Sequence, residues 1–218
     1  MNNFAGTTGY REVLDRFVQA SESVDFEVLH TCIMHLIPTE PCRILDVGAG
    51  SGRDAAALAV MGHEVTAVEP LAQAIAAARQ LHNSPNITWI CDGYPDLSTL
   101  EPESRGFAFI LCHAVWQHLE PDQRSAAIAR SFELLNPGGI FALALRHGPV
   151  GAGTHSFPAT AAETIALAES HGFRVVMHLA NQASAMTDKA KVHWTRLAFR
   201  RKIQFPTLHP KPSLPAPI

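Results

Sequence analysis

A glycine-rich turn between an apolar strand and a helix constrains the fold of this chain more than any other feature. Residues 43–47 form a short apolar run that predicts a buried strand. Gly48, Gly50 and Gly52 follow at alternate positions, and an alanine-rich helix is expected from about 53 to 61. Glycines let the backbone approach a ligand at a distance that a Cβ would prevent. The turn therefore predicts a ligand site at the carboxyl end of a strand.

Apolar strands and helical patterns alternate along the rest of the chain. Further strands are expected at 64–68, 87–90, 107–111, 140–145, 173–179 and 192–200, and helices at 71–81, 121–135 and 160–172. This alternation predicts an α/β fold with a parallel sheet covered on both faces, because each crossover helix must bury an apolar stripe. The ligand site of such a sheet lies beyond the carboxyl ends of its strands.

The two ends of the chain differ from the alternating middle. Residues 1–40 are expected to form a helical N-terminal segment, because apolar residues such as Phe26, Leu29 and Ile33 recur at helical spacing. Residues 203–218 carry five prolines and are expected to form an extended tail without regular structure. The main domain is therefore expected to span residues 41–202.

Composition excludes several classes of partner. The net charge is -3 and the pI about 6.4, so no broad cationic field is available for nucleic acid. No uncharged apolar run approaches the ~18 residues of a membrane span, and the first residues do not have the pattern of a secretory signal. A cytoplasmic protein without a membrane partner is expected. The four cysteines form no CxxC pair and there is no His-Glu-x-x-His motif, so no metal site is expected.

Two common nucleotide-binding motifs do not fit the glycine turn. The nicotinamide fingerprint Gly-x-Gly-x-x-Gly requires a glycine at position 53, where the chain has Arg53. The P-loop requires Gly-Lys-Ser/Thr, which is absent at the needed distance. The remaining pattern is Asp46 followed by three alternate glycines, with Glu69 at the end of the next strand. The carboxylate of Glu69 can accept hydrogen bonds from two ribose hydroxyls.

With these features the sequence resembles the class I S-adenosylmethionine-dependent methyltransferases, of the small single-domain bacterial type. The resemblance also includes Cys91–Gly93, Leu111–Leu119 and Leu134–Gly139, each at the expected place between strands. It covers residues 42–146 well and extends loosely to about 200. It implies a Rossmann-like three-layer sandwich whose seven-stranded, mostly parallel sheet has an antiparallel last strand. By the same analogy, residues 1–40 would fold over the cofactor as a lid.

The resemblance implies S-adenosylmethionine as the cofactor and assigns ten residues to its site. They are Asp46, Gly48, Gly50, Gly52, Glu69, Pro70, Leu71, Asp92, Gly93 and His113. By resemblance, Asp46 and the glycine turn would meet the methionine portion, and Glu69 would hold the ribose diol. Asp92 would bond the adenine amino group, with Pro70 and Leu71 beside the ring.

Three histidines are candidates for a catalytic general base. His113 and His118 follow the fourth expected strand and His147 follows the fifth, so all three lie at the ligand end of the sheet. The alternative for His118 is a packing or capping role at the following helix. Arg146 is a candidate for binding an anionic acceptor, and His155 in the same loop is a weaker candidate base.

The acceptor is expected to be a small molecule. No Asn/Asp-Pro-Pro-Tyr motif follows the fourth strand, which argues against methylation of DNA bases or glutamine amides. The core fold occupies most of the chain and leaves only the N-terminal segment and residues 146–159 to form an acceptor pocket. The sequence fixes neither the methylated atom nor the oligomeric state. A non-catalytic S-adenosylmethionine-binding sensor or partner subunit is the main alternative, and a nicotinamide-dependent oxidoreductase is disfavoured by the glycine spacing.

Overall fold

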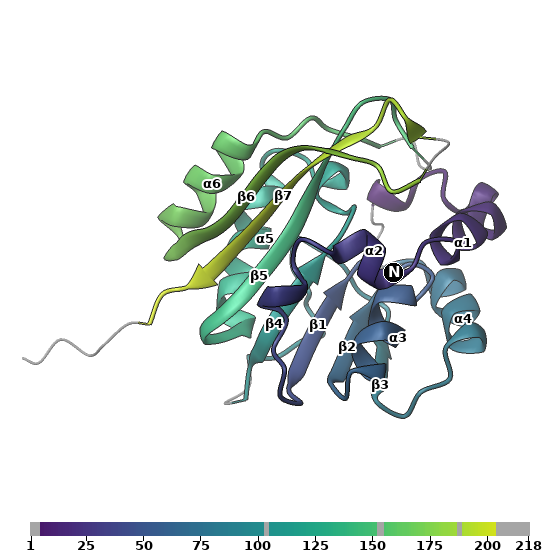
Figure 1. The fold of residues 1–218 in the computed structure, drawn as a ribbon, viewed down its shortest axis with the longest axis horizontal. Helices are drawn as coiled ribbons and strands as arrows, with labels where there is room; N and C mark the ends of the chain where they lie inside the picture. Colours follow the sequence, from purple (N-terminus) through teal and green to yellow (C-terminus); the bar gives the residue numbers. More distant parts are fainter. Residues whose placement is uncertain (1–4, 103–104, 152–154, 187–188, 204–218) are drawn as a thin grey trace, which may run out of the picture.

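The fold is built on one seven-stranded sheet (Figure 1). The computed structural model describes residues 5–102, 105–151, 155–186 and 189–203. Its strands are β1 (Arg43–Val47), β2 (Glu64–Val68), β3 (Ile87–Ile90), β4 (Phe107–Cys112), β5 (Leu135–His147), β6 (Phe173–Ala183) and β7 (His193–Arg201). The strand order is β3-β2-β1-β4-β5-β7-β6; β1 to β5 pair in parallel, and β7 runs antiparallel to both neighbours. The predicted sheet with an antiparallel last strand is confirmed.

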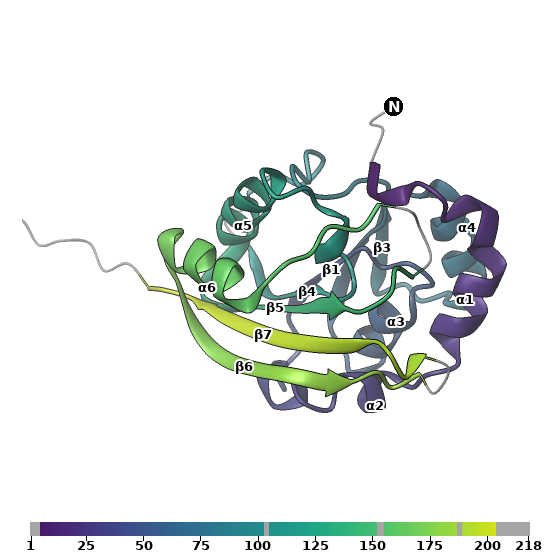
Figure 2. The same ribbon diagram turned by 90° about the horizontal axis from the view of Figure 1, so that it is seen from above.

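Helices cover both faces of the sheet and complete a three-layer sandwich (Figure 2). They are α1 (Leu14–Glu22), α2 (Phe26–His30), α3 (Arg53–Val60), α4 (Ala72–Leu81), α5 (Gln123–Leu134) and α6 (Ala161–Ser170). Residues that alternate along a strand point to opposite faces. Leu45 accordingly packs in the core cluster that includes α5 and α6, whereas Ile44 packs in the cluster with α2 and α3. In the parts of the chain that the structure describes, no helix is long and apolar enough to span a bilayer.

The N-terminal segment is less regular than predicted. Its described part consists of α1, α2 and three short 3-10 turns, η1 (Ala5–Thr7), η2 (Arg11–Val13) and η3 (Met34–Leu36). Gly9, with φ 86°, and Asp25, in an extended conformation, interrupt a continuous helix. The apolar positions behave as expected, because Phe26 and Ile33 are buried in the core. The predicted tail, apart from its first residue, lies outside the described residues.

The fifth strand begins earlier than predicted. The sequence indicated a turn at Gly138 and Gly139 and a strand only from residue 140, but β5 starts at Leu135. The register against β4 shifts after the pair Phe107–Leu135, and Gly138 has φ 82°. A strand irregularity of this kind accommodates positive φ without ending the strand. The glycines therefore lie inside β5.

Candidate functional site

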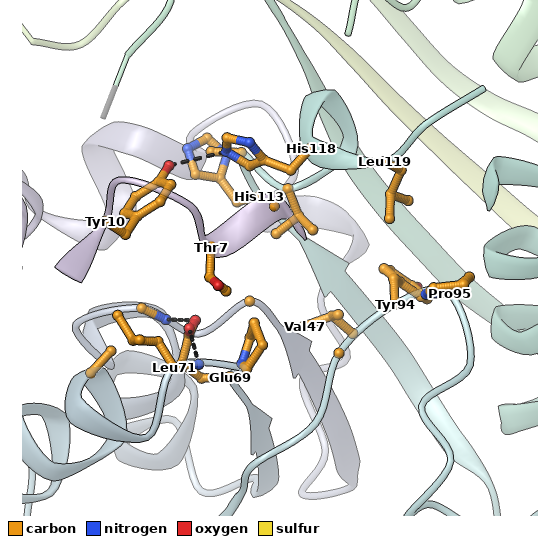
Figure 3. Close-up of a pocket in the computed structure, with 18 of the residues that line it drawn as sticks. Thr7, Tyr10, Val47, Glu69, Leu71, Tyr94, Pro95, His113, His118 and Leu119 are labelled. Carbon is orange, nitrogen blue, oxygen red and sulfur yellow. Dashed lines mark hydrogen bonds between the residues drawn. The ribbon is translucent and has the colours of Figure 1, made fainter. Parts of the chain in front are cut away.

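A cavity of about 480 Å³ lies at the carboxyl ends of β1, β2 and β4 (Figure 3). Its first wall comes from the ends of β1 and β2 and includes Val47, Gly48, Gly50, Glu69, Pro70 and Leu71. Its second wall combines the segment after β4 with the N-terminal segment and includes Gly6, Tyr10, Phe17, His113, Val115 and His118. The sheet order reverses between β1 and β4, and ligands of open α/β sheets bind at such a switch point. The cavity therefore has the predicted position.

Glu69 is the main charged group of the first wall. Its Oε2 accepts a hydrogen bond from the Gly50 N–H at 3.0 Å, and its Oε1 accepts one from the Leu71 N–H at 2.9 Å. Burial raises the pKa of Glu69, and these two backbone hydrogen bonds oppose that rise. A carboxylate has about four acceptor positions, so two remain for hydroxyl groups of a ligand.

Two glycines of the turn form cavity wall, and the third has another role. A Cβ on Gly48 would lie 2.2 Å from Val115 Cγ2, and one on Gly50 would lie 3.0 Å from the Phe17 ring. Both residues have positive φ, which also favours glycine. Gly52 does not line the cavity, and its added Cβ would lie 2.7 Å from Trp89. Gly52 is therefore required for local packing at the start of α3.

Asp46 and Asp92 are buried and do not line the cavity. The Asp46 Oδ2 has no hydrogen-bond partner among the described residues. Burial raises the pKa of Asp46 well above its usual value, and the charge of Asp54 adds to this. Asp92 accepts hydrogen bonds from the Gly93 and Thr99 N–H groups and from the Thr99 hydroxyl. The carboxylate of Asp92 thus holds the loop after β3, while Gly93 itself lines the cavity.

His118 is held in one tautomer on the second wall. Its Nδ1 lies 2.6 Å from the carbonyl oxygen of His155, which can only accept, so Nδ1 carries the proton. The unprotonated Nε2 then accepts the hydroxyl of Tyr10 at 3.0 Å (Figure 3). Burial lowers the pKa of His118, and the charge of Arg146 adds to this. The structure therefore presents a neutral imidazole with a basic nitrogen at the cavity.

His113 also reaches the cavity, whereas His147 does not. The His113 ring stacks on Trp194 with centroids 5.1 Å apart, and burial lowers its pKa well below the usual value. His147 lies 2.9 Å from the Thr195 hydroxyl and stacks on His193 at 4.9 Å. His147 is absent from the cavity lining. Of the three candidate bases, the structure brings His113 and His118 to one cavity.

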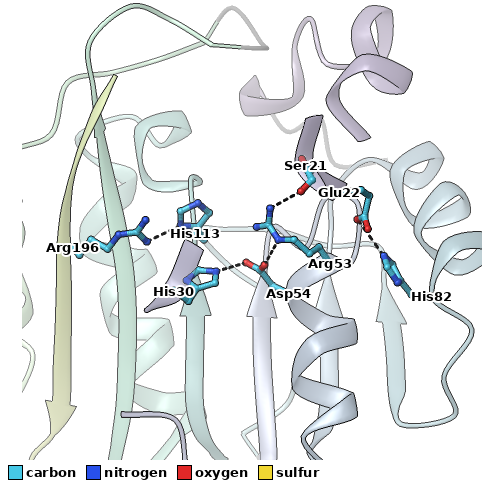
Figure 4. A network of polar contacts seen from close by, with 8 residues as sticks. All are labelled: Ser21, Glu22, His30, Arg53, Asp54, His82, His113 and Arg196. Carbon is cyan, nitrogen blue, oxygen red and sulfur yellow. Dashed lines mark hydrogen bonds and ion pairs between the residues drawn. The ribbon is translucent and has the colours of Figure 1, made fainter. Parts of the chain in front are cut away.

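A buried charge network anchors the N-terminal segment to α3 (Figure 4). His30 Nε2 lies 2.8 Å from Asp54 Oδ2, and Arg53 Nε lies 2.7 Å from Asp54 Oδ1. Arg53 Nη1 also donates to the Ser21 carbonyl at 2.7 Å. Burial alone would raise the pKa of Asp54, but His30 and Arg53 outweigh it and hold that pKa below the usual range. Both α1 and α2 are therefore fixed to the first turn of α3.

Sequence reasoning did not identify the contact between Tyr10 and His118. Tyr10 lies in the expected N-terminal segment, and no motif indicates that its hydroxyl reaches a residue 108 positions away. His155 contributes its backbone carbonyl to His118. Arg146 does not line the cavity; its guanidinium donates to the Pro149 carbonyl. The described residues include no group of three or more His, Cys, Asp or Glu suited to a metal ion.

Comparison with known proteins agrees with this geometry. Residues 44–139 match a family model described as a methyltransferase domain. An uncharacterized methyltransferase of Mycobacterium bovis is 33% identical over 108 residues, which are 50% of this chain and 52% of that protein. A ubiquinone biosynthesis O-methyltransferase of Albidiferax ferrireducens is 32% identical over 122 residues, which are 54% of this chain and 46% of that protein. The chain thus spans about half the length of the curated relatives it matches.

The fold is also that of solved methyltransferases. The crystal structure of Burkholderia thailandensis 1,6-didemethyltoxoflavin-N1-methyltransferase, with bound 1,6-didemethyltoxoflavin and S-adenosylhomocysteine, superposes with a TM-score of 0.63. The identity is 23%, and the match covers 89% of both chains. The strand order and the match over residues 44–139 together make this chain similar to the S-adenosylmethionine-dependent methyltransferases.

Proposed function

We propose that this chain transfers the methyl group of S-adenosylmethionine to a hydroxyl or N–H group of a small-molecule acceptor. The observation that carries the proposal is the Glu69 carboxylate, which lines the cavity between two backbone N–H donors and keeps acceptor positions for a ribose. The relatives named above include an O-methyltransferase and an N-methyltransferase, which supports an oxygen or nitrogen acceptor.

The residues of the first wall fit the cofactor chemically. Glu69 would hold the ribose hydroxyls, and Pro70 and Leu71 offer an apolar surface for the adenine. The backbone at Gly48 and Gly50 would lie along the methionine portion, where side chains would collide. The buried Asp46 keeps an unpartnered Oδ2 close to the turn, and a cation bound there would favour its ionised form. When bound, the cofactor supplies a methyl group already activated by a positively charged sulfur.

The protein then has two tasks. It must align the acceptor with that methyl group, and it must take up the proton that the acceptor loses. Holding two reactants in attacking geometry accounts for much of the catalysis in such a reaction. His118 is the proposed proton acceptor, because its Nε2 is unprotonated and its ring is oriented by the His155 carbonyl. His113 is neutral and lines the same cavity, so we assign it to positioning of the ligands.

The test is transfer of isotope-labelled methyl from S-adenosylmethionine to a panel of phenols, catechols and heteroaromatic N–H compounds. Glu69→Gln is expected to reduce transfer at least tenfold at a fixed, subsaturating cofactor concentration. Glu64→Gln is the matched control, because Glu64 is an exposed carboxylate at the start of the same strand. Tight cofactor binding without labelled product from any acceptor class would instead favour a non-catalytic binder, which the comparisons do not support.

A further inference from the structure

The N-terminal segment makes direct contact with the proposed proton acceptor. Tyr10 and His118 both line the cavity, and their rings meet edge to face with centroids 5.5 Å apart. Gly6 lies against His118 so closely that an added Cβ would be 2.9 Å from His118 Cβ. Tyr10 also packs edge-on against Phe17 at 5.2 Å, which holds its ring in place. The contact is therefore a packed junction of two chain segments.

The hydrogen bonds at this junction have one possible direction. The His155 carbonyl takes the Nδ1 proton of His118, so the Tyr10 hydroxyl must donate to Nε2. Gln117 Nε2 donates one N–H to the Ala114 carbonyl at 2.5 Å and lies 3.2 Å from the same His118 nitrogen, so its second N–H shares that acceptor with the Tyr10 hydroxyl. The Tyr10 oxygen keeps its lone pairs, and Tyr10 is part of the cavity lining. A donor bound in the cavity can therefore reach His118 through the Tyr10 hydroxyl.

We infer that Tyr10 and His118 act as a two-residue proton relay that exists only when the N-terminal segment is seated on the cavity. The inference rests on the proposed methyl transfer. As the acceptor oxygen or nitrogen gains its bond to the methyl carbon, the bond between that carbon and the sulfonium sulfur breaks and its electron pair stays on sulfur. The acceptor's proton passes to the Tyr10 oxygen, and the Tyr10 proton passes at the same time to His118 Nε2. The products are S-adenosylhomocysteine, a methylated acceptor, a neutral Tyr10 and a His118 imidazolium, which later releases its proton to water.

The charges around Tyr10 and His118 disfavour a stable phenolate at Tyr10. They favour instead a proton that is transferred along the hydrogen bonds of the relay. Burial and the charge of Glu69 raise the pKa of Tyr10 to about 12, and Arg146 acts in the opposite direction. His118 faces Arg146 and His155 as well as Tyr10, and burial is the largest cause of its lowered pKa. Tyr10 is therefore protonated at neutral pH, and its oxygen gains a proton only as it gives one up.

The relay also explains why position 6 is a glycine. A side chain there would push the N-terminal segment away from His118 and separate Tyr10 from Nε2, although the tyrosine itself would remain. Gly6→Ala therefore breaks the geometry of the relay, and Tyr10→Phe breaks its chemistry. Tyr94→Phe and Gly151→Ala are matched controls. The Tyr94 hydroxyl bonds Ser131, and a Cβ on Gly151 would make only ordinary contacts.

The test is the His118 imidazole titration, followed by NMR in the full chain without acceptor. Tyr10→Phe and Gly6→Ala are expected to raise the pKa of His118, because each removes a donor that stabilises the neutral ring. The two controls are expected to leave it unchanged. S-adenosylmethionine affinity of Tyr10→Phe, measured by calorimetry, is expected to stay within twofold of wild type. An unchanged His118 titration in Tyr10→Phe, or a tenfold loss of cofactor affinity, would overturn the relay.

Turnover supplies the second measurement once the acceptor panel gives a substrate. Tyr10→Phe is expected to reduce kcat at least tenfold, to leave the KM for S-adenosylmethionine within twofold, and to shift the acidic limb of the kcat profile. If Tyr10 had a purely structural role, Tyr10→Phe would leave the acidic limb of the pH profile of kcat unchanged. Failure of the proposed function would look different: wild type would not bind S-adenosylmethionine, while the His118 titration would still respond to Tyr10→Phe.

Discussion

The two walls of the cavity are built in different ways. On the first wall, Glu69 bonds Gly50 and Leu71, residues at most 19 positions away. On the second wall, His118 bonds Tyr10 across 108 positions and His155 across 37. The first wall follows from two adjacent strands and their turns, whereas the second depends on how distant segments pack. Under the proposed function, cofactor binding has a local origin in this chain and handling of the acceptor has a tertiary one.

The first wall follows from the strand topology, whereas the second wall depends on segments that are particular to this protein. The strand order fixes where β1 and β2 end, so Glu69 and the glycine turn meet in any chain with this topology and these residues. The second wall is made by loops and by the N-terminal segment, which are the parts that vary most easily. Substitutions in the first wall should accordingly affect cofactor binding, and substitutions in the second wall should affect methyl transfer.

The largest expected effect comes from breaking the anchor of the N-terminal segment. His30→Ala leaves the buried Asp54 carboxylate with fewer partners, and such a loss costs about 3–5 kcal/mol of unfolding free energy. His82→Ala is the matched control in the same network, because the pair of His82 and Glu22 is partly exposed. Removal of an exposed pair costs ~1 kcal/mol or less. Equal losses of unfolding free energy in His30→Ala and His82→Ala, measured by denaturant unfolding, would contradict the anchoring role of the His30–Asp54 pair.

The same anchor predicts a pH dependence. The pKa of Asp54 is depressed in the folded protein, so its contribution to stability is present above the unfolded value of about 3.9 and is lost as pH falls below it. His30→Ala is expected to make this acid-side loss of unfolding free energy shallower. An unchanged slope below pH ~4 would show that His30 does not set the Asp54 pKa.

The next effect distinguishes the two walls directly. Glu69→Ala is expected to weaken S-adenosylmethionine binding at least tenfold, a loss of about 1.4 kcal/mol or more. His118→Ala is expected to keep that affinity within twofold and to reduce methyl transfer instead, because it removes the proposed proton acceptor. Calorimetry for binding and labelled-methyl transfer for turnover provide the two measurements. Equal effects of both variants on affinity would remove the distinction between the walls.

The smallest expected effect concerns Asp46. Its folded-state pKa is raised, so the folded protein loses stability as pH rises from the unfolded value of about 3.9 through the folded one. Asp46→Asn cannot ionise and is expected to stabilise the free protein at pH 8. The same variant is expected to weaken cofactor binding. Thermal unfolding with and without cofactor checks both, and destabilisation of the free protein would contradict the prediction.

The sequence predicted the first wall better than the second for a physical reason. Buried strands are short apolar runs, and the alternate glycines at 48 and 50 mark the turn whose close approach to Val115 and Phe17 excludes side chains. The helix expected from residue 160 is present as α6, where the Thr160 hydroxyl accepts the Glu163 N–H at 3.2 Å. The Tyr10–His118 contact has no local signal, because neither residue's neighbours in sequence reveal which segment packs on which.

The differences between the predictions and the structure have equally local causes. The spacing of apolar residues predicts a helical N-terminal segment, but the same spacing is kept when short helices and turns pack on a sheet. Gly138 and Gly139 are common in turns and also in strand irregularities, and sequence alone does not separate the two. Asp92 was assigned to the adenine by resemblance, and its carboxylate oxygens bond Gly93 and Thr99 in this structure. Its role at the cofactor stays a prediction.

The most direct measurement is thermal unfolding of the wild-type chain with S-adenosylmethionine, S-adenosylhomocysteine or NADH. A ligand that binds the native state stabilises it by about 2.7 kcal/mol at a hundred times its Kd. The account predicts a clear rise in Tm with both adenosyl ligands and none with NADH, and loss of that rise in Glu69→Ala. No rise with either adenosyl ligand, or a rise with NADH alone, would contradict the assignment of the cavity.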